Sequence, residues 1–166
     1  MLREDVEIRF LPLYSPEADA LGAELAPALV VNRKNLVEGV PSVEEIKELV
    51  ENSRSRLGVL LTKAPGGEEA ENALTMALEA LDQGNRADIF CLSDGVWLTK
   101  QGPKGPLEKR LPQFMGRGGK VWASGEHLKA AGLTKERLVP QVEVADDALG
   151  DLVDMIMDQW DKVVVL

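Results

Sequence analysis

The chain has 166 residues, a formal net charge of −9 and a single cysteine. With 45% hydrophobic and 28% charged residues it is composed like an ordinary globular protein, and no stretch approaches the ~18 unbroken apolar residues of a membrane span. The acidic start "MLREDVEIRF" does not fit a signal peptide, and one cysteine excludes an internal disulfide, so we expect a cytoplasmic protein. The negative charge argues against nucleic acid as a partner, because binding a phosphate backbone depends on Lys and Arg.

The first fifty residues predict a small βαββα unit. Its expected elements are a strand "VEIRFLPL", a helix "SPEADALGAEL", a strand "PALVV", a strand "LVEG" and a helix "SVEEIKELVEN". Ser15 before Pro16 is a typical helix start, and Ser42 with Glu45 forms a capping box. Because a unit of residues 1–52 buries a modest share of its surface, we expect it to pack against another domain or subunit.

A polar stretch, residues 53–57, is expected to link this unit to a second domain over residues 58–166. There the apolar runs "GVLLTKAP", "ADIFCLSDGVWL", "KVWAS", "QVEV" and "KVVVL" alternate with helical patterns. Apolar strands that alternate with helices are typical of a parallel sheet covered on both faces. The predicted fold is therefore a three-layer, doubly wound α/β domain with a mostly parallel sheet.

Two of the expected helices have features of their own. The helix in "PLEKRLPQFMGRGG" should be short or kinked, because Pro112 lies inside it. The helix in "DDALGDLVDMIMDQW" is expected to carry one apolar stripe. The members of that stripe are Leu149, Leu152, Val153, Ile156 and Trp160.

In sheets of this kind, ligands bind beyond the carboxyl ends of the strands, near a switch in strand order. The loops at residues 63–68, 93–96 and 123–127 are therefore the candidate binding loops. The residues Pro65, Gly66 and Gly67 precede a helix and could present backbone N–H groups to an anion, although two glutamates follow and phosphate-loop patterns are absent. A plain loop is the alternative. Asp94 follows a strand and could serve either a turn or a binding site.

The corner "KVWASGEHLKAAGL" places Ser124, Gly125 and His127 where a strand leads into a helix. A serine hydroxyl needs a base to act as a nucleophile, and His127 is the only histidine. The hydrolase pattern G-x-S-x-G is absent, and helical spacing does not reliably aim this histidine at the serine. Ser124 could be the centre of a hydrolase or transferase site, or it could simply cap the helix. One histidine and one cysteine do not make a zinc site of the usual composition, so no metal or cofactor is predicted.

From residue 58 to residue 166 the chain resembles the DsrE/DsrF-like family. The resemblance rests on "GVLLTKAPGGEEAENALTMALEAL", "ADIFCLSDGVWLTKQG", "GRGGKVWASGEHLKAAGL" and the aspartate-rich helix before "WDKVVVL". It implies a flavodoxin-like sheet and assembly into a trimer or hexamer. It also implies a link to intracellular sulfur relay, in which the best understood members carry a persulfide on a cysteine.

The matching position for that cysteine is Ser124, and a serine oxygen cannot hold a transferable sulfane sulfur. The only thiol, Cys91, falls in the middle of "IFCLS", where a free cysteine is more often an inert core residue. We therefore expect a non-catalytic subunit, or a module that binds a small ligand or a partner, linked to sulfur transfer. It would form homo-oligomers, or hetero-oligomers with other sulfur-relay proteins. A purely structural assembly protein is a further alternative.

Residues 6–52 are similar to the later part of a thioredoxin-like fold. Ala26 and Pro27 precede the strand "ALVV" at the place of that family's cis-proline, and a hairpin and a helix follow. The first strand and the Cys-x-x-Cys helix are missing. The similarity implies a redox-inactive fragment kept for packing or assembly, and an unrelated βαββα unit explains the same pattern equally well.

Overall fold

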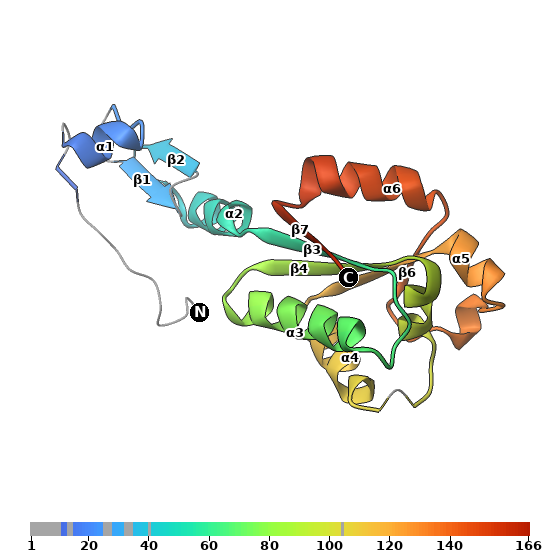
Figure 1. The fold of residues 1–166 in the computed structure, drawn as a ribbon. Helices are drawn as coiled ribbons and strands as arrows, with labels where there is room; N and C mark the ends of the chain where they lie inside the picture. Colours follow the sequence, from blue (N-terminus) through green and yellow to red (C-terminus); the bar gives the residue numbers. More distant parts are fainter. Residues whose placement is uncertain (1–10, 13–14, 25–27, 32–34, 40, 104) are drawn as a thin grey trace. The chain divides into compact units, whose positions relative to one another are not determined.

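A computed structural model describes residues 11–12, 15–24, 28–31, 35–39, 41–103 and 105–166. It divides the chain into two compact units, Met1–Arg54 and Ser55–Leu166 (Figure 1). The connection between them is shorter than the expected linker, because the last helix of the first unit ends at Ser53 and the first strand of the second begins at Arg56.

The described part of the N-terminal unit contains two helices and a two-stranded antiparallel sheet. They are α1 (Pro16–Ala20), β1 (Ala28–Val31), β2 (Asn35–Glu38) and α2 (Val43–Ser53). The Oγ of Ser15 accepts a hydrogen bond at the start of α1, and the capping box of Ser42 and Glu45 forms at the start of α2. α1 ends earlier than predicted, at Ala20, and Gly22 turns the chain with a φ of +74°. Most of the predicted first strand, and Pro27, lie outside the described residues.

The larger unit is a five-stranded parallel sheet with the order β6-β5-β4-β3-β7. Its strands are β3 (Arg56–Leu61), β4 (Arg86–Cys91), β5 (Lys120–Ser124), β6 (Glu143–Ala145) and β7 (Lys162–Val165). Its helices are α3 (Glu68–Asp82), α4 (Leu107–Gly116), α5 (Gly125–Ala130) and α6 (Ala148–Asp154). Short 3-10 turns cover Ser93–Thr99 (η1) and Lys135–Arg137 (η2), and a π-helical turn, Met155–Gln159 (η3), continues α6.

Helices cover both faces of this sheet. Figure 1 shows α3 and α4 on one side and α6 on the other. A large apolar cluster joins the first side to α3, α4 and α5, with Val59, Leu74 and Phe114 fully buried in it. A smaller cluster joins Phe90 and Trp160 to α6. The predicted α/β fold with a mostly parallel sheet is confirmed.

α4 is short, at 10 residues, and it continues through Pro112. The N–H that a proline lacks would have bonded to the carbonyl four residues earlier, that of Glu108, so the helix tolerates Pro112 with one bond fewer. The apolar stripe of the last helix is only partly buried. Leu152 and Trp160 are buried, whereas Leu149, Val153 and Ile156 are exposed.

Candidate functional site

The carboxyl ends of the strands bring the predicted loops to one edge of the sheet. Residues 63–68, 93–96 and 123–127 follow β3, β4 and β5, which are neighbours in the sheet. The connections after these three strands lead to the face that carries α3, α4 and α5, whereas the connection after β6 leads to α6 on the opposite face. The switch therefore falls between β5 and β6, where ligands of open α/β sheets commonly bind.

Ser124 and His127 lie at this switch point and contact each other. Ser124 ends β5 and caps α5, and its Oγ accepts a hydrogen bond from the backbone N–H of His127 over 3.4 Å. The Nδ1 atom of His127 lies 2.8 Å from the same Oγ. Helical spacing alone does not reliably aim this histidine at the serine, but in this structure the two side chains do contact each other. Side chains in a first helical turn point back toward the N-terminus, as the glutamate of a capping box does.

Burial limits what Ser124 can do. Its exposed fraction is 0%, and Gly125 beside it is also buried. A Cβ atom on Gly125 would lie 3.1 Å from the carbonyl oxygen of Ala145 and 3.4 Å from Oδ1 of Asp146, so β6 and the loop after it close tightly over the corner. A substrate would reach the Ser124 hydroxyl only if α5 or this loop moved.

The only thiol is still less reactive. Cys91 ends β4, is 0% exposed, and stands in register with Leu61 and Ala123 of the neighbouring strands. Burial raises the pKa of the Cys91 thiol to about 12. A protonated and inaccessible sulfur is neither a nucleophile nor an acceptor of sulfur.

The glycine loop after β3 has acids at the start of the following helix. Gly66 has a φ of +124°, and Pro65 and Gly67 form an isolated bridge. Glu68, Glu69 and Glu71 occupy the first turn of α3, where their charge satisfies the positive end of the helix. The loop therefore has the features of a plain turn.

The loop after β4 is tightly built around Gly95. A Cβ there would lie 2.1 Å from the carbonyl oxygen of Leu61, so only glycine fits against β3. Ser93 precedes it with a φ of +48°, a conformation that sequence patterns give no sign of. Asp94 between them is exposed, whereas Ser124 is buried.

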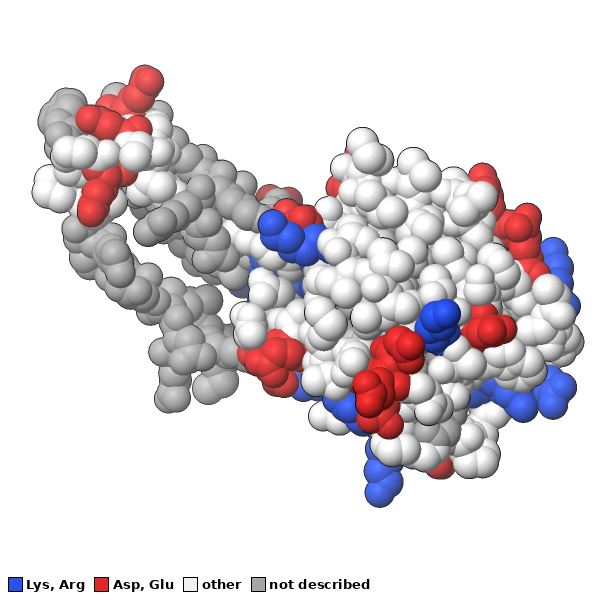
Figure 2. All heavy atoms as spheres, viewed as in Figure 1, with Lys and Arg blue, Asp and Glu red and all other residues white. Residues whose placement is uncertain are grey.

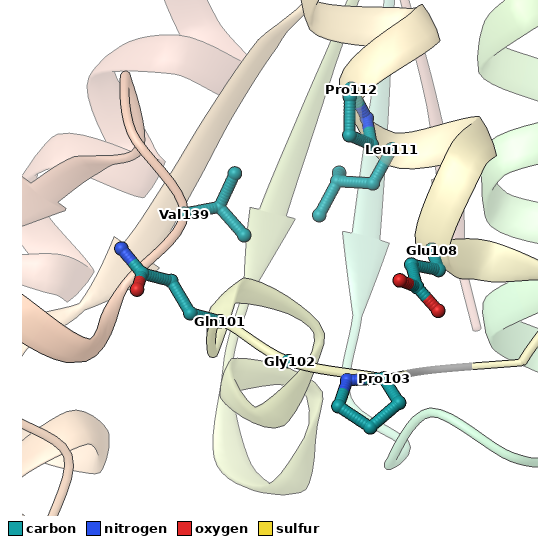
Figure 3. Close-up of a pocket in the computed structure, with 7 residues that line it drawn as sticks. All are labelled: Gln101, Gly102, Pro103, Glu108, Leu111, Pro112 and Val139. Carbon is teal, nitrogen blue, oxygen red and sulfur yellow. The ribbon is translucent and has the colours of Figure 1, made fainter.

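A cavity of about 240 Å³ lies elsewhere in this unit (Figure 3). It is lined by Gln101, Gly102, Pro103, Glu108, Leu111, Pro112 and Val139. None of the predicted site residues is among them. Gln101 donates from Nε2 to the carbonyl of Leu138 over 2.7 Å, so part of the polar lining is already bonded. The volume is below the ~300 Å³ at which small-molecule pockets usually begin. Sequence patterns miss this cavity because it joins segments distant along the chain.

Within the ranges that the structure describes, no group of three or more His, Cys, Asp or Glu side chains is placed to hold a metal ion. The described helices also include none that is both long and apolar enough to cross a membrane.

The model of the DsrE/DsrF-like family matches residues 55–166. The chain belongs to the DsrE/DsrF-like family. The matched segment contains Ser124, His127, Cys91 and the loops of Gly66 and Asp94.

Two uncharacterised archaeal proteins are similar to this DsrE/DsrF-like chain. MK0008 of Methanopyrus kandleri is 38% identical over 106 residues, which cover 60% of this chain and 85% of that protein. MJ0989 of Methanocaldococcus jannaschii is 34% identical over 112 residues, which cover 64% of this chain and 95% of that protein.

Two solved structures share the fold. The ychN protein of E. coli gives a TM-score of 0.58 at 20% identity and covers 68% of this chain and 99% of its own. MTH1491 of Methanobacterium thermoautotrophicum, a protein of unknown function, gives 0.57 at 17% identity with the same coverages. These similarities place the DsrE-like fold in the larger unit.

Proposed function

We propose that this protein is a non-catalytic subunit or binding module of intracellular sulfur transfer, which carries no persulfide itself. The observation that supports this most directly is the state of Cys91, the only thiol of the chain: it is 0% exposed and its pKa is raised to about 12. At pH 7 such a thiol stays protonated, whereas a few per cent of ordinary exposed cysteines are ionised.

The corner of Ser124 supports the same proposal. The family resemblance puts the sulfur-accepting cysteine at this position, and the residue here offers an oxygen in place of sulfur. The Ser124 hydroxyl is buried and bonded to His127. The corner therefore keeps the architecture of an acceptor site without the atom that accepts sulfur.

The test is a sulfur-loading experiment with a matched gain-of-function variant. The wild type, Cys91→Ser and Ser124→Cys are each incubated with a sulfurtransferase and its sulfur donor and examined by intact-protein mass spectrometry without reductant. We expect no mass gain for the wild type or for Cys91→Ser. We expect a gain of one sulfur atom for Ser124→Cys when α5 or the loop after β6 moves, because a thiolate at this helix start next to His127 is stabilised. A sulfur adduct on Cys91 of the wild type contradicts the proposal.

Assembly with other subunits is part of the same proposal, because a subunit without an acceptor atom acts on sulfur only through a partner. It covers homo-oligomers such as a trimer or hexamer, and hetero-oligomers with other sulfur-relay proteins. The N-terminal unit, as a truncated thioredoxin-like or unrelated βαββα module, would contribute to this assembly. Light scattering should show fewer subunits in the oligomer when residues 1–52 are deleted. An unchanged number of subunits would show that the N-terminal unit does not contribute to assembly.

A second candidate is a hydrolase or transferase centred on Ser124. The distance of 2.8 Å between His127 Nδ1 and Ser124 Oγ favours it, because a serine nucleophile needs a base within hydrogen-bond reach. The full burial of Ser124 stands against it. A screen of ester, thioester and phosphoester substrates decides between the two, with Ser124→Ala and His127→Gln as variants. Equal rates in the wild type and the variants exclude a hydrolase or transferase centred on Ser124.

A further inference from the structure

The face of the sheet that carries α6 has exposed apolar side chains next to its cluster. Within the described part of the larger unit, α3, α4 and α5 pack on the other face, whereas α6 and its π-helical continuation are the helical segments on this one. Six apolar residues of α6, η3 and β7 are more than a third exposed. They are Leu149 (69%), Val153 (56%), Ile156 (38%), Met157 (75%), Val163 (39%) and Val165 (64%).

The exposed apolar residues of α6 and of the start of η3 lie along one side of this helical segment. Leu149, Val153 and Ile156 follow helical spacing. An aspartate lies two residues before each of them, and Asp158 continues the same spacing; the acids are Asp147, Asp151, Asp154 and Asp158. Residues two apart in a helix point to opposite sides, so the acids are kept away from the apolar stripe. In Figure 2 the surface over α6 and β7 is largely free of charged residues.

Val163 and Val165 point to the same face of the sheet as α6. Their register partners in β3 are Gly58 and Leu60. Gly58 lies directly against the ring of Trp160, and Leu60 packs against the cluster that α6 covers. Because side chains at register positions of paired strands share a face, the two valines extend the apolar surface from α6 to the edge of the sheet.

The backbone of β7 is also available at this edge. β7 is the last strand in the sheet order, and its described pairing is with β3. Leu166 donates its N–H to the carbonyl of Leu60 over 2.9 Å and accepts from the N–H of Thr62 over 2.8 Å. Since backbone groups alternate along a strand, those of Val163 and Val165 point away from β3. An apolar edge strand without proline is a template for pairing with another strand.

The area suits an interface between proteins. With roughly 90 Å² of apolar surface for each such side chain, the six exposed fractions amount to about 300 Å². A standard interface buries about 800 Å² per partner, of which about 450 Å² is apolar. The patch thus supplies roughly two-thirds of the apolar surface that a stable dimer needs, before the strand backbone and the half-buried Leu60 are counted.

We infer that β7 pairs antiparallel with β7 of a second copy of this chain, about a two-fold axis at Val164. In this register Val163 of one copy faces Val165 of the other, and the backbone groups that point away from β3 bond to each other. The pairing joins two five-stranded sheets into one and brings the two α6 stripes to the same face. A second copy is the occupant that fits, because an antiparallel edge pair is self-complementary and the patch is uncharged at its centre. This inference does not depend on the role in sulfur transfer.

A symmetric disulfide tests the register. Val164 faces Val164 of the second copy as a non-hydrogen-bonded pair, with Cα atoms about 4.5 Å apart, within the range that a disulfide spans. Val164→Cys is treated with diamide, which takes up the two electrons and two protons of the thiol pair. We expect a covalent dimer on a non-reducing gel. Buried Cys91 leaves the wild type uncrosslinked, and Met76→Cys, 37% exposed on α3, is the matched control. The absence of a Val164→Cys dimer, or equal crosslinking of Met76→Cys, overturns the register.

Analytical ultracentrifugation of the full chain tests whether the partner is a second copy, because it measures the mass of the particle. We expect an even number of chains, and the double variant Val163→Lys with Val165→Lys should halve the mass or raise the dissociation constant at least about tenfold, because edge lysines oppose strand pairing. Met76→Lys should leave the mass unchanged, and thermal unfolding checks that each variant is folded. A monomeric or trimeric wild type overturns the inference, as does an unchanged mass of the double variant. Sulfur loading of Ser124→Cys has no bearing on either outcome.

Discussion

The Nδ1 atom of His127 lies 2.8 Å from the Oγ of Ser124, and that oxygen also accepts the first-turn N–H of His127. The two contacts give one hydroxyl a structural role and a potential chemical role. Because Ser124 is fully buried, its structural role can be measured through stability, whatever the corner does chemically.

Replacing Ser124 by alanine should destabilise the larger unit. The variant loses the side-chain cap of α5 and leaves the His127 side chain without its buried partner, and the loss of such a cap costs about 1 kcal/mol, within a range of ~0.5–2. For a unit of this size we expect a fall in Tm of about 3–6 °C. Thermal unfolding followed by circular dichroism measures it. Glu126→Gln, exposed on the same helix, is the control, and a Tm of Ser124→Ala equal to that of the control contradicts the prediction.

Cys91 should resist thiol reagents until the protein unfolds. The native sulfur is inaccessible and protonated, with its pKa raised to about 12 by burial. We expect modification by Ellman's reagent at neutral pH to proceed at the rate of unfolding, independent of reagent concentration at high concentration. Met76→Cys in the Cys91→Ser background gives an accessible comparison thiol, because Met76 is 37% exposed on α3. Rapid labelling of the wild type at a rate that rises with reagent concentration would contradict the prediction, because it would show that Cys91 is accessible in the folded protein.

The same buried thiol predicts a pH dependence of stability. The unfolded thiol loses its proton near pH ~8.5, whereas the folded thiol keeps it up to about pH 12. The contribution of Cys91 is therefore constant below pH ~8.5 and falls as pH rises through this window, because the unfolded chain then binds fewer protons. The stability difference between wild type and Cys91→Ala, from urea unfolding at pH 7 to 10.5, should shrink above pH ~8.5. A difference that is constant over this range contradicts the raised pKa.

Local patterns predicted the elements of the fold well. The capping box of Ser42 and Glu45 forms as expected because its two hydrogen bonds involve residues three apart, and no distant part of the chain is needed. The parallel sheet was predictable for a similar reason. Strands such as β4, which is buried from Ala87 to Cys91, require helices on both faces.

Features that depend on where helices cross the sheet were not predictable. The apolar stripe of the last helix is only partly buried, because α6 packs Leu152 against the sheet and the π-helical turn then brings Trp160 inward. The contact of His127 with Ser124 was missed because spacing alone does not fix a side-chain torsion. Ser93 in a left-handed conformation leaves no sign in the sequence, since a serine adopts it only under tertiary constraint.

Gly58→Ala should be strongly destabilising. A Cβ at Gly58 would lie 2.1 Å from the ring of Trp160, which is 7% exposed, so the indole would have to move out of the core. We expect a loss of about 1–3 kcal/mol in the free energy of unfolding, as for overpacked cores. Gly116→Ala is the matched control because a Cβ there meets nothing within 4 Å, and Ala is the better helix former. Urea unfolding measures both, and similar midpoints for the two variants contradict the prediction.

Trp160→Phe should be destabilising through Asp88. The indole Nε1 donates to Oδ2 of Asp88 over 2.9 Å, and that carboxylate is 4% exposed at the amino end of β4. Phe fills most of the same space but cannot donate, which leaves Asp88 with the Arg56 Nε at 3.8 Å as its described charge partner. A buried acceptor without its donor costs about 1–3 kcal/mol. Adding Asp88→Asn should change this cost, because the two substitutions act on one hydrogen bond. A double-mutant cycle measured by urea unfolding gives the coupling energy between the two substitutions. Trp97→Phe, at a half-exposed tryptophan, is the control. Additive effects of the two substitutions would show that the hydrogen bond contributes nothing to stability.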